Sequence, residues 1–162
     1  MQSMDTKEFI DAYRQHLPRV SKYLAYRVEA NDIEDLAAQI FAIAWQKRAN
    51  CPEGQQLAWL YKIAGYVVSN YRRKIKAITL SLFDSDATAH SAESLVISNL
   101  VIANAWDSLP KKQRVVLALF AFDQLSITDI ALALNISNNA ASIRLHRARA
   151  AFDAALKKQN GA

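Results

Sequence analysis

Apolar residues recur every three or four positions through almost all of this 162-residue chain, a spacing that favours helices over strands. The first series runs through Phe9, Tyr13, Leu17, Val20, Leu24 and Val28. The sequence holds only three glycines, and no segment alternates apolar and polar residues at the period of a strand. We therefore expect an all-α protein.

Residues 1–76 are expected to form four helices. Pro18 interrupts the first apolar series, and proline lacks an amide hydrogen and clashes with the preceding helical turn, so a second helix is expected to start near it. Asn31 or Asp32 is placed to cap a third helix. A loop follows at residues 50–56, marked by Pro and Gly. The fourth helix ends in the basic run Arg72, Arg73, Lys74 and Lys76.

Residues 77–91 lose the helical period and collect Ser, Asp, Thr and Ala, which is typical of a linker. Beyond it, Asp107 or Ser108 is expected to cap a helix with Pro110 in its first turn. Ser126 opens a short helix with the capping-box-like sequence SITD, Asn135 is a left-handed stop, and Ser137 caps a long last helix. A short helix, a turn of about three residues and a longer helix predict a helix-turn-helix.

Charge is distributed in three blocks. Residues 1–76 carry 12 Lys and Arg against 8 Asp and Glu, and residues 107–162 carry 8 against 4. The stretch between them, residues 77–106, has three acids and no Lys or Arg. Two basic blocks around an acidic middle suit two nucleic-acid-binding modules on a linker that does not bind. An ordinary solvated surface explains excesses of this size equally well.

Several classes of protein find no support in the sequence. No apolar run approaches the roughly 18–20 residues that span a bilayer, and the start MQSMDTKEF is too polar for a secretory signal. Cys51 is the only cysteine, and the three histidines lack ligand spacing, so neither a metal site nor another cofactor is expected. There is no nucleophile–base constellation and no Gly-rich phosphate loop. We expect a cytoplasmic protein that is not an enzyme and does not insert into membranes.

Three stretches resemble the sigma-70 family of bacterial RNA polymerase, in particular its extracytoplasmic-function (ECF) group. The helix EDLAAQIFAIAW is similar to the family's region two, and AWLYKIAGYVVSNYRRK is similar to the helix after its promoter-melting loop. LPKKQR and RLHRAR, with the helix-turn-helix between them, resemble region four. The region-two matches are Glu34, Asp35, Leu36, Gln39, Phe41 and Trp45.

This resemblance implies two small helical domains joined by a linker. Residues 1–76 would be region two, a four-helix domain that binds core polymerase and recognises and melts the minus-ten element. Residues 77–104 would be the linker, and residues 105–162 region four, whose helix-turn-helix reads the minus-thirty-five element. The implied partners are the clamp helices and flap of the polymerase, promoter DNA and, as is common in the family, an anti-sigma factor. The free chain is expected to be a monomer.

Two other functions stay open at this point. A stand-alone helix-turn-helix regulator would bind duplex DNA without polymerase. A sigma mimic would occupy polymerase without reading DNA, and it stays open because the recognition helix starts with Ala140, Ala141, Ser142 and Ile143 where the family usually has Thr-Val-Lys-Ser.

The candidates for minus-thirty-five contacts lie on the expected outward face and flanks of the last helix. Asn and Arg make bidentate contacts with adenine and guanine in the major groove. Lys111, Lys112 and Arg114 could contact phosphate at a helix start. A solvated basic helix end explains the same pattern. The recognition-helix candidates are Asn138, Asn139, Ser142, Ile143, Arg144, His146, Arg147 and Arg149.

The candidates for minus-ten contacts combine aromatic rings and cations, which suit unstacked single strands. Tyr61, Tyr66 and Tyr71 provide the rings, although most aromatic residues of this helix are expected in the core. The candidate minus-ten residues are Asn50, Cys51, Gln55, Tyr66, Asn70, Arg72, Arg73 and Lys74. For polymerase binding the family motif points to Asp35, Gln39 and Phe41, while acids in a first turn also stabilise a helix by themselves.

Overall fold

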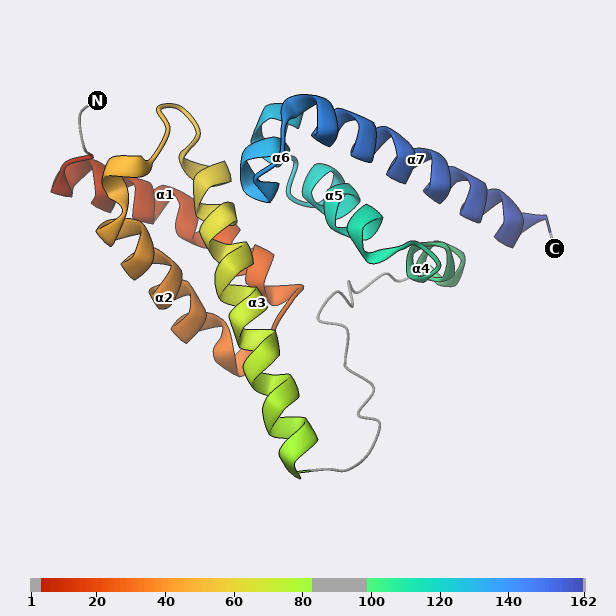
Figure 1. Ribbon diagram of the computed structural model, residues 1–162, viewed down its shortest axis with the longest axis horizontal. Helices are drawn as coiled ribbons and strands as arrows, with labels where there is room; N and C mark the ends of the chain where they lie inside the picture. Colours follow the sequence, from red (N-terminus) through yellow and green to blue (C-terminus); the bar gives the residue numbers. More distant parts are fainter. Residues whose placement is uncertain (1–3, 83–98, 162) are drawn as a thin grey trace. The chain divides into compact units, whose positions relative to one another are not determined.

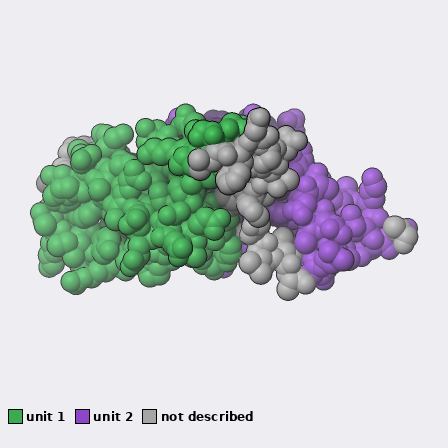
Figure 2. Space-filling view, turned by 90° about the horizontal axis from the view of Figure 1, so that it is seen from below, with its two compact units in different colours: residues 1–95 green, residues 96–162 purple. Residues whose placement is uncertain are grey.

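The computed structural model describes residues 4–82 and 99–161. Within these ranges it contains seven α-helices, two short 3-10 helices and no strand (Figure 1). The expected all-α fold is confirmed. The chain divides into two compact units, residues 1–95 and residues 96–162 (Figure 2).

The first unit is built from α1 (Thr6–Ala25), α2 (Ile33–Gln46) and α3 (Gln56–Leu82), each of which contacts the other two. The 3-10 helices η1 (Ala30–Asp32) and η2 (Arg48–Asn50) lie before and after α2. Val20, Leu24, Ile40 and Ala64 are completely buried and come from all three helices. Their burial holds the three helices together as one bundle.

The expectation of a helix break at Pro18 is wrong, because α1 continues through it to Ala25. The helix is nucleated by a capping box: the Glu8 amide donates to Asp5 Oδ1 at 2.8 Å, and the Asp5 amide donates to Glu8 Oε2 at 3.1 Å. Beyond Pro18, Tyr23 and Leu24 are buried in the bundle. Burying large side chains stabilises by about 1.5–3 kcal/mol each, which offsets the roughly 3 kcal/mol cost of an interior proline. The described part of the first unit therefore has three α-helices instead of four.

Helix α3 also differs from its expected length. It continues past Lys76 to Leu82, and Figure 1 shows its C-terminal half extending beyond α1 and α2. Adding residues to an existing helix costs far less than starting one, so Ala77 and Ile78 extend it although both are exposed. Helical structure also enters the other end of the range 77–104 assigned to a linker, because α4 begins at Leu100. Residues 83–98 of that range lie outside the described residues.

The second unit consists of α4 (Leu100–Asp107), α5 (Lys111–Ala121), α6 (Ile127–Leu134) and α7 (Asn138–Asn160). Helix α7 contacts the other three. Trp106 of α4 is 4% exposed, and its ring centroid lies 5.7 Å from that of Phe122 and 6.4 Å from that of Phe152. Ala141, Leu145 and Ala148 of α7 are buried and form the inner stripe of this helix. The unit is thus organised around α7.

Helix α4 was not recognised in the sequence. Asn99 caps it, with Oδ1 accepting the Val101 amide at 2.9 Å, and the Ser108 hydroxyl donates to the Ala105 carbonyl at 2.6 Å at its other end. The expectation that Asp107 or Ser108 caps the next helix is therefore wrong, since both belong to the end of α4. Helix α5 begins directly after Pro110 and has no side-chain cap.

The helix-turn-helix is formed by α6 and α7, and its three predicted punctuation residues are confirmed. Ser126 Oγ accepts the Asp129 amide at 3.1 Å at the start of α6. Asn135 ends α6 in the left-handed conformation, with φ of 56°. Ser137 Oγ then accepts the Ala140 amide at 3.0 Å at the start of α7. These local bonds fix the direction in which α7 leaves the turn.

Candidate nucleic-acid interface

The N-terminal half of α7 carries the predicted base-contacting residues. Seven of its eight predicted base-contacting residues are exposed, and Arg144 is half-buried. At about 100° per residue, Ile143 lies almost directly opposite the buried stripe of Ala141, Leu145 and Ala148. Asn139 and Arg147 lie one turn before and one turn after it. We call Asn139, Ile143 and Arg147 the outer ridge.

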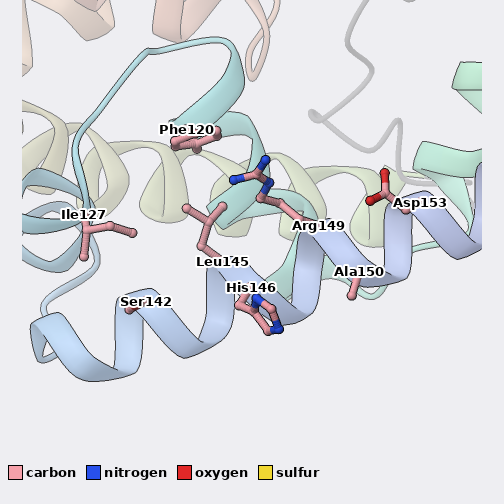
Figure 3. Close-up of a pocket in the computed structure, with 8 residues that line it drawn as sticks. All are labelled: Phe120, Ile127, Ser142, Leu145, His146, Arg149, Ala150 and Asp153. Atoms are coloured by element: carbon pink, nitrogen blue, oxygen red, sulfur yellow. The ribbon is translucent and has the colours of Figure 1, made fainter.

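The remaining candidates do not all share this ridge. Ser142, His146 and Arg149 line a hollow of ≈ 520 Å³ on the side of α7 (Figure 3). Phe120 of α5 and Ile127 of α6 form its opposite wall, and the Arg149 guanidinium lies 5.4 Å from the centroid of the Phe120 ring. The structure therefore divides the predicted set between an outward ridge and a shared hollow.

Phe120 and Ile127 reach the surface of the second unit, which the sequence alone does not indicate. Phe120 sits in the apolar run VVLALFAF, where nothing distinguishes it from its buried neighbours, yet its side chain is 38% exposed. Only the packing of α5 against α6 and α7 decides which residues of that run reach the surface. The hollow is thus a tertiary feature without a local sequence signal.

The start of α5 carries positive charge on an uncapped helix end. Lys111 and Lys112 are exposed in its first turn, where cations oppose the helix dipole. An incoming anion would interact favourably with both the cations and the amide groups of this turn. The arrangement can therefore position a phosphate, without reading any base.

On α3, three predicted minus-ten residues share one face. Tyr66 is 62% exposed, and Asn70 and Arg73 follow it at helical spacing of four and three residues. The Arg73 guanidinium donates to Asn70 Oδ1 at 2.6 Å. Arg72 is half-buried, and the helical period places it and Lys74 on other sides of α3.

The predicted loop residues form a separate group at the start of α3. Asn50 is exposed, Cys51 and Gln55 are half-buried, and Gly54 makes the turn with φ of 75°. Cys51 Sγ contacts the Pro52 carbonyl at 3.6 Å, and burial raises the pKa of the thiol, which stays protonated at neutral pH. Tyr66 lies eleven residues after Gln55, roughly 16 Å further along the helix. The loop and the α3 face are thus distinct surfaces of the first unit.

Two aromatic residues of α3 have structural tasks. Tyr61 is 2% exposed and stacks on Tyr23 with ring centroids 4.9 Å apart, so including it among base-stacking residues was wrong. The Tyr71 hydroxyl donates to Asp32 Oδ2 at 2.7 Å. Asp32 occupies the N-cap position of α2 as expected, but its carboxylate makes no capping bond and accepts this phenol instead. Burial first, and then this hydrogen bond, raise the pKa of Tyr71.

The three residues matched to polymerase binding divide by burial. Asp35 and Gln39 are exposed and lie one turn apart on α2. Phe41 is 5% exposed and packs edge-on against Tyr13, with ring centroids 4.7 Å apart. In the described part of the first unit, Phe41 is a core residue. Of the three, only Asp35 and Gln39 are exposed enough for a partner to contact them directly.

Two family models match the chain, sigma-70 region 2 over residues 12–78 and sigma-70 region 4 over residues 100–152. These matches cover the helical bundle of the first unit and the helix-turn-helix of the second. The chain belongs to the sigma-70 family. It is an RNA polymerase sigma factor of the ECF type, and the family consists of non-catalytic transcription initiation factors.

Known sigma factors resemble this one over nearly its whole length. The ECF RNA polymerase sigma factor SigF of Caulobacter vibrioides (strain NA1000 / CB15N) is 29% identical over 159 residues, which are 93% of this chain and 88% of SigF. The structure of CnrH in complex with the cytosolic domain of CnrY matches with a TM-score of 0.62 and 21% identity, over 95% of this chain and 90% of CnrH. Sigma factor RpoE in complex with the anti-sigma factor NepR from Bartonella quintana matches with a TM-score of 0.63 and 21% identity, over 94% of this chain and 98% of RpoE. The two solved structures show the same fold.

Other kinds of site are not found in the described ranges 4–82 and 99–161. There, no group of three or more His, Cys, Asp or Glu side chains could hold a metal ion. None of the helices described is both long and apolar enough to cross a membrane.

Proposed function

We propose that this sigma factor divides promoter-directed initiation between its two units. Residues 1–76 would bind core polymerase and recognise and melt the minus-ten element, and residues 105–162 would read the minus-thirty-five element, with residues 77–104 between them. The observation that carries this proposal is the capped helix-turn-helix, which exposes Asn139 and Arg147 on one ridge of α7. Their side chains suit adenine and guanine edges in the major groove.

For the minus-thirty-five element, we assign base contacts to the outer ridge, with Asn138 and Arg144 at its flanks. Ser142, His146 and Arg149 line the hollow. At about 100° per residue His146 lies beside the outer ridge, whereas Ser142 and Arg149 stand further round the helix and would reach DNA only at the edge of the contact. Lys111 and Lys112 would hold phosphate and set the position of α7 in the groove.

For the minus-ten element, the α3 face and the loop have complementary properties. Tyr66 is an exposed ring on which an unpaired base could stack. Arg73 adds positive charge two turns further along the same face, and Lys74 adds it on a neighbouring side of the helix. The loop with Asn50, Cys51 and Gln55 would receive a base that has left the duplex. Arg72 and Asn70 complete this proposed set.

For polymerase, the exposed pair Asp35 and Gln39 on α2 is the proposed contact with the clamp helices. The hollow beside α7 is the proposed contact with the flap, because Phe120, Ile127 and Leu145 give it apolar walls. Phe41 is buried, so we propose that it supports the exposed α2 surface from the core and does not contact the polymerase itself.

The proposed cellular location and partners of the chain follow from its proposed role in initiation. The chain would act in the bacterial cytoplasm, where polymerase meets the chromosome, as a monomer before it binds core enzyme and without catalysis of its own. CnrH and RpoE were each solved with a protein bound, the cytosolic domain of CnrY and the anti-sigma factor NepR. By analogy, an anti-sigma factor is a proposed partner of this chain.

Initiation from a random promoter pool tests the proposed function. Purified full chain is added to bacterial core polymerase, and transcripts are sequenced from templates randomised over both promoter elements. The proposal expects one enriched pair of elements that depends on the added chain. Enrichment of no element, with core bound, would identify a sigma mimic, and DNA binding without core binding would identify a stand-alone regulator.

A further inference from the structure

Ile143 is an apolar side chain at the centre of a polar ridge. It is 43% exposed and lies almost opposite the buried stripe of α7. Asn139 and Arg147 flank it along the helix. An isoleucine here leaves apolar surface in water and is a weaker helix former than alanine. A branched apolar side chain with 43% of its surface exposed is suited to contact with a bound surface.

The C5-methyl of thymine is the largest apolar group on the base edges of the major groove. The edges of the other bases present mainly hydrogen-bond donors and acceptors, which an isoleucine cannot satisfy and would only desolvate. A polar side chain would be the better choice opposite guanine, adenine or cytosine. The chemistry of Ile143 therefore selects a thymine.

We propose that Ile143 contacts the C5-methyl of a thymine in the minus-thirty-five element, an inference that rests on the proposed function of α7. The Cα atoms of Asn139 and Arg147 stand about 6 Å before and after Ile143 along the helix axis. That distance is close to two base-pair steps of about 3.4 Å each. The thymine thus lies within about two base pairs of the bases that Asn139 and Arg147 contact. This makes Ile143 a specificity-determining residue of the chain.

Deoxyuridine gives a test at the level of one methyl group, because it pairs like thymine and lacks only the C5-methyl. The enriched minus-thirty-five element is synthesised with each thymine replaced in turn, and its affinity for holoenzyme made from full chain and core polymerase is measured. Burial of one methyl group is worth about 0.8 kcal/mol, which corresponds to about fourfold in affinity. We expect a loss of about fourfold at one thymine.

The same templates are then measured with holoenzyme carrying Ile143→Ala. This variant should bind the thymine promoter more weakly and should show no further loss at the sensitive thymine when it is replaced by deoxyuridine. Alanine keeps the helix, so α7 stays folded. Leu100→Ala is the matched control, since Leu100 is an aliphatic residue of the same unit, 74% exposed on α4. It should retain the fourfold effect of deoxyuridine.

Three results would overturn the inference while leaving the proposed function intact. The first is an enriched minus-thirty-five element that contains no thymine. The second is a loss of affinity on deoxyuridine substitution that persists in holoenzyme carrying Ile143→Ala. The third is a loss of affinity from Ile143→Ala that is the same for the thymine and deoxyuridine templates at every position. The last result would place Ile143 against a protein surface. If holoenzyme enriches no element at all, the proposed function itself fails, and this inference fails with it.

Discussion

Gln124 and Asn135 are the two described non-glycine residues with positive φ, at 58° and 56°. Asparagine adopts this left-handed conformation readily because its short side chain bonds locally, and Asn135 uses it to end α6. Glutamine has no such advantage, and the conformation costs an ordinary residue about 1–2 kcal/mol. Gln124 is exposed between α5 and α6, and its strain is a local cost of the tight connection there.

Replacing Gln124 by glycine should remove that strain. We expect Gln124→Gly to raise the free energy of unfolding of the second unit by about 0.5–1 kcal/mol, the relief being partly offset by the freedom of glycine in the unfolded chain. Asn135→Gly is the matched control and should change it by only a few tenths. Denaturant unfolding measures both, and a less stable Gln124→Gly chain would contradict this account of the turn.

Tyr71 and Asp32 form the hydrogen bond that ties α3 to the start of α2. Tyr71→Phe should lower the free energy of unfolding by about 1 kcal/mol, because the variant removes the donor and leaves a half-buried carboxylate with one partner fewer. Tyr66→Phe, at an exposed hydroxyl, should leave it unchanged. Chemical denaturation at neutral pH distinguishes them, and equal stabilities of both variants would refute the assigned role.

The same bond predicts a pH dependence. Because the folded state raises the pKa of Tyr71 above its ordinary value of 10.0, folding favours the protonated phenol. The resulting stabilisation is complete below pH 10 and is lost as the pH rises through the higher folded pKa. Wild-type stability should therefore fall more steeply above pH 10 than that of Tyr71→Phe, as measured by unfolding curves between pH 8 and 11. If the stabilities of the wild type and of Tyr71→Phe fall equally steeply with pH, the raised pKa of Tyr71 does not contribute to stability.

At the scale of elements, local chemistry and tertiary packing determined different features. The helix-turn-helix could be predicted because Ser126, Asn135 and Ser137 each make their hydrogen bond or special conformation within four residues. The length of α1 could not, because the burial of Leu24 that holds it together depends on α2 and α3. Helix α4 was missed because it has only eight residues, too few to show a clear helical period.

Pro18 offers a test of this explanation of α1. If packing holds the helix together against the proline, Pro18→Ala should restore the missing hydrogen bond and raise the free energy of unfolding of the first unit by about 2 kcal/mol. Pro110→Ala is the control, because Pro110 stands before the first turn of α5, where its missing amide costs nothing. Thermal unfolding provides the comparison, and a destabilised Pro18→Ala would show that the proline supports the helix.

Only part of the candidate site could be predicted from the sequence. The helical period alone placed Asn139, Ile143 and Arg147 outward on α7, and the structure has them exposed. It could not show that Ser142, His146 and Arg149 share a hollow with Phe120, because that depends on how α5 packs beside α7. The helical period of α2 also puts Phe41 at the edge of its apolar stripe and Asp35 on the opposite side, and the structure has Phe41 buried and Asp35 exposed.

At the scale of the whole molecule, binding of the polymerase clamp and reading of the minus-thirty-five element are the proposed tasks of different units. A sigma factor built in this way can lose one task and keep the other. Arg147 on α7 and Asp35 on α2 are the exposed residues that best represent the two tasks. Two other exposed residues of α1, Arg14 and Asp11, provide controls that change the net charge by the same amount.

The decisive measurement compares core affinity and promoter affinity for Arg147→Ala and Asp35→Ala in the full chain, with Arg14→Ala and Asp11→Ala beside them. Arg147→Ala should weaken binding of holoenzyme to the enriched promoter by about 1–3 kcal/mol, the value of a good bidentate base contact, and leave the affinity for core polymerase unchanged. Asp35→Ala should weaken core binding and leave the promoter affinity of the holoenzyme that does form unchanged. If Arg147→Ala lowers promoter affinity no more than Arg14→Ala does, or if both variants impair both affinities alike, the division of tasks between the two units is wrong.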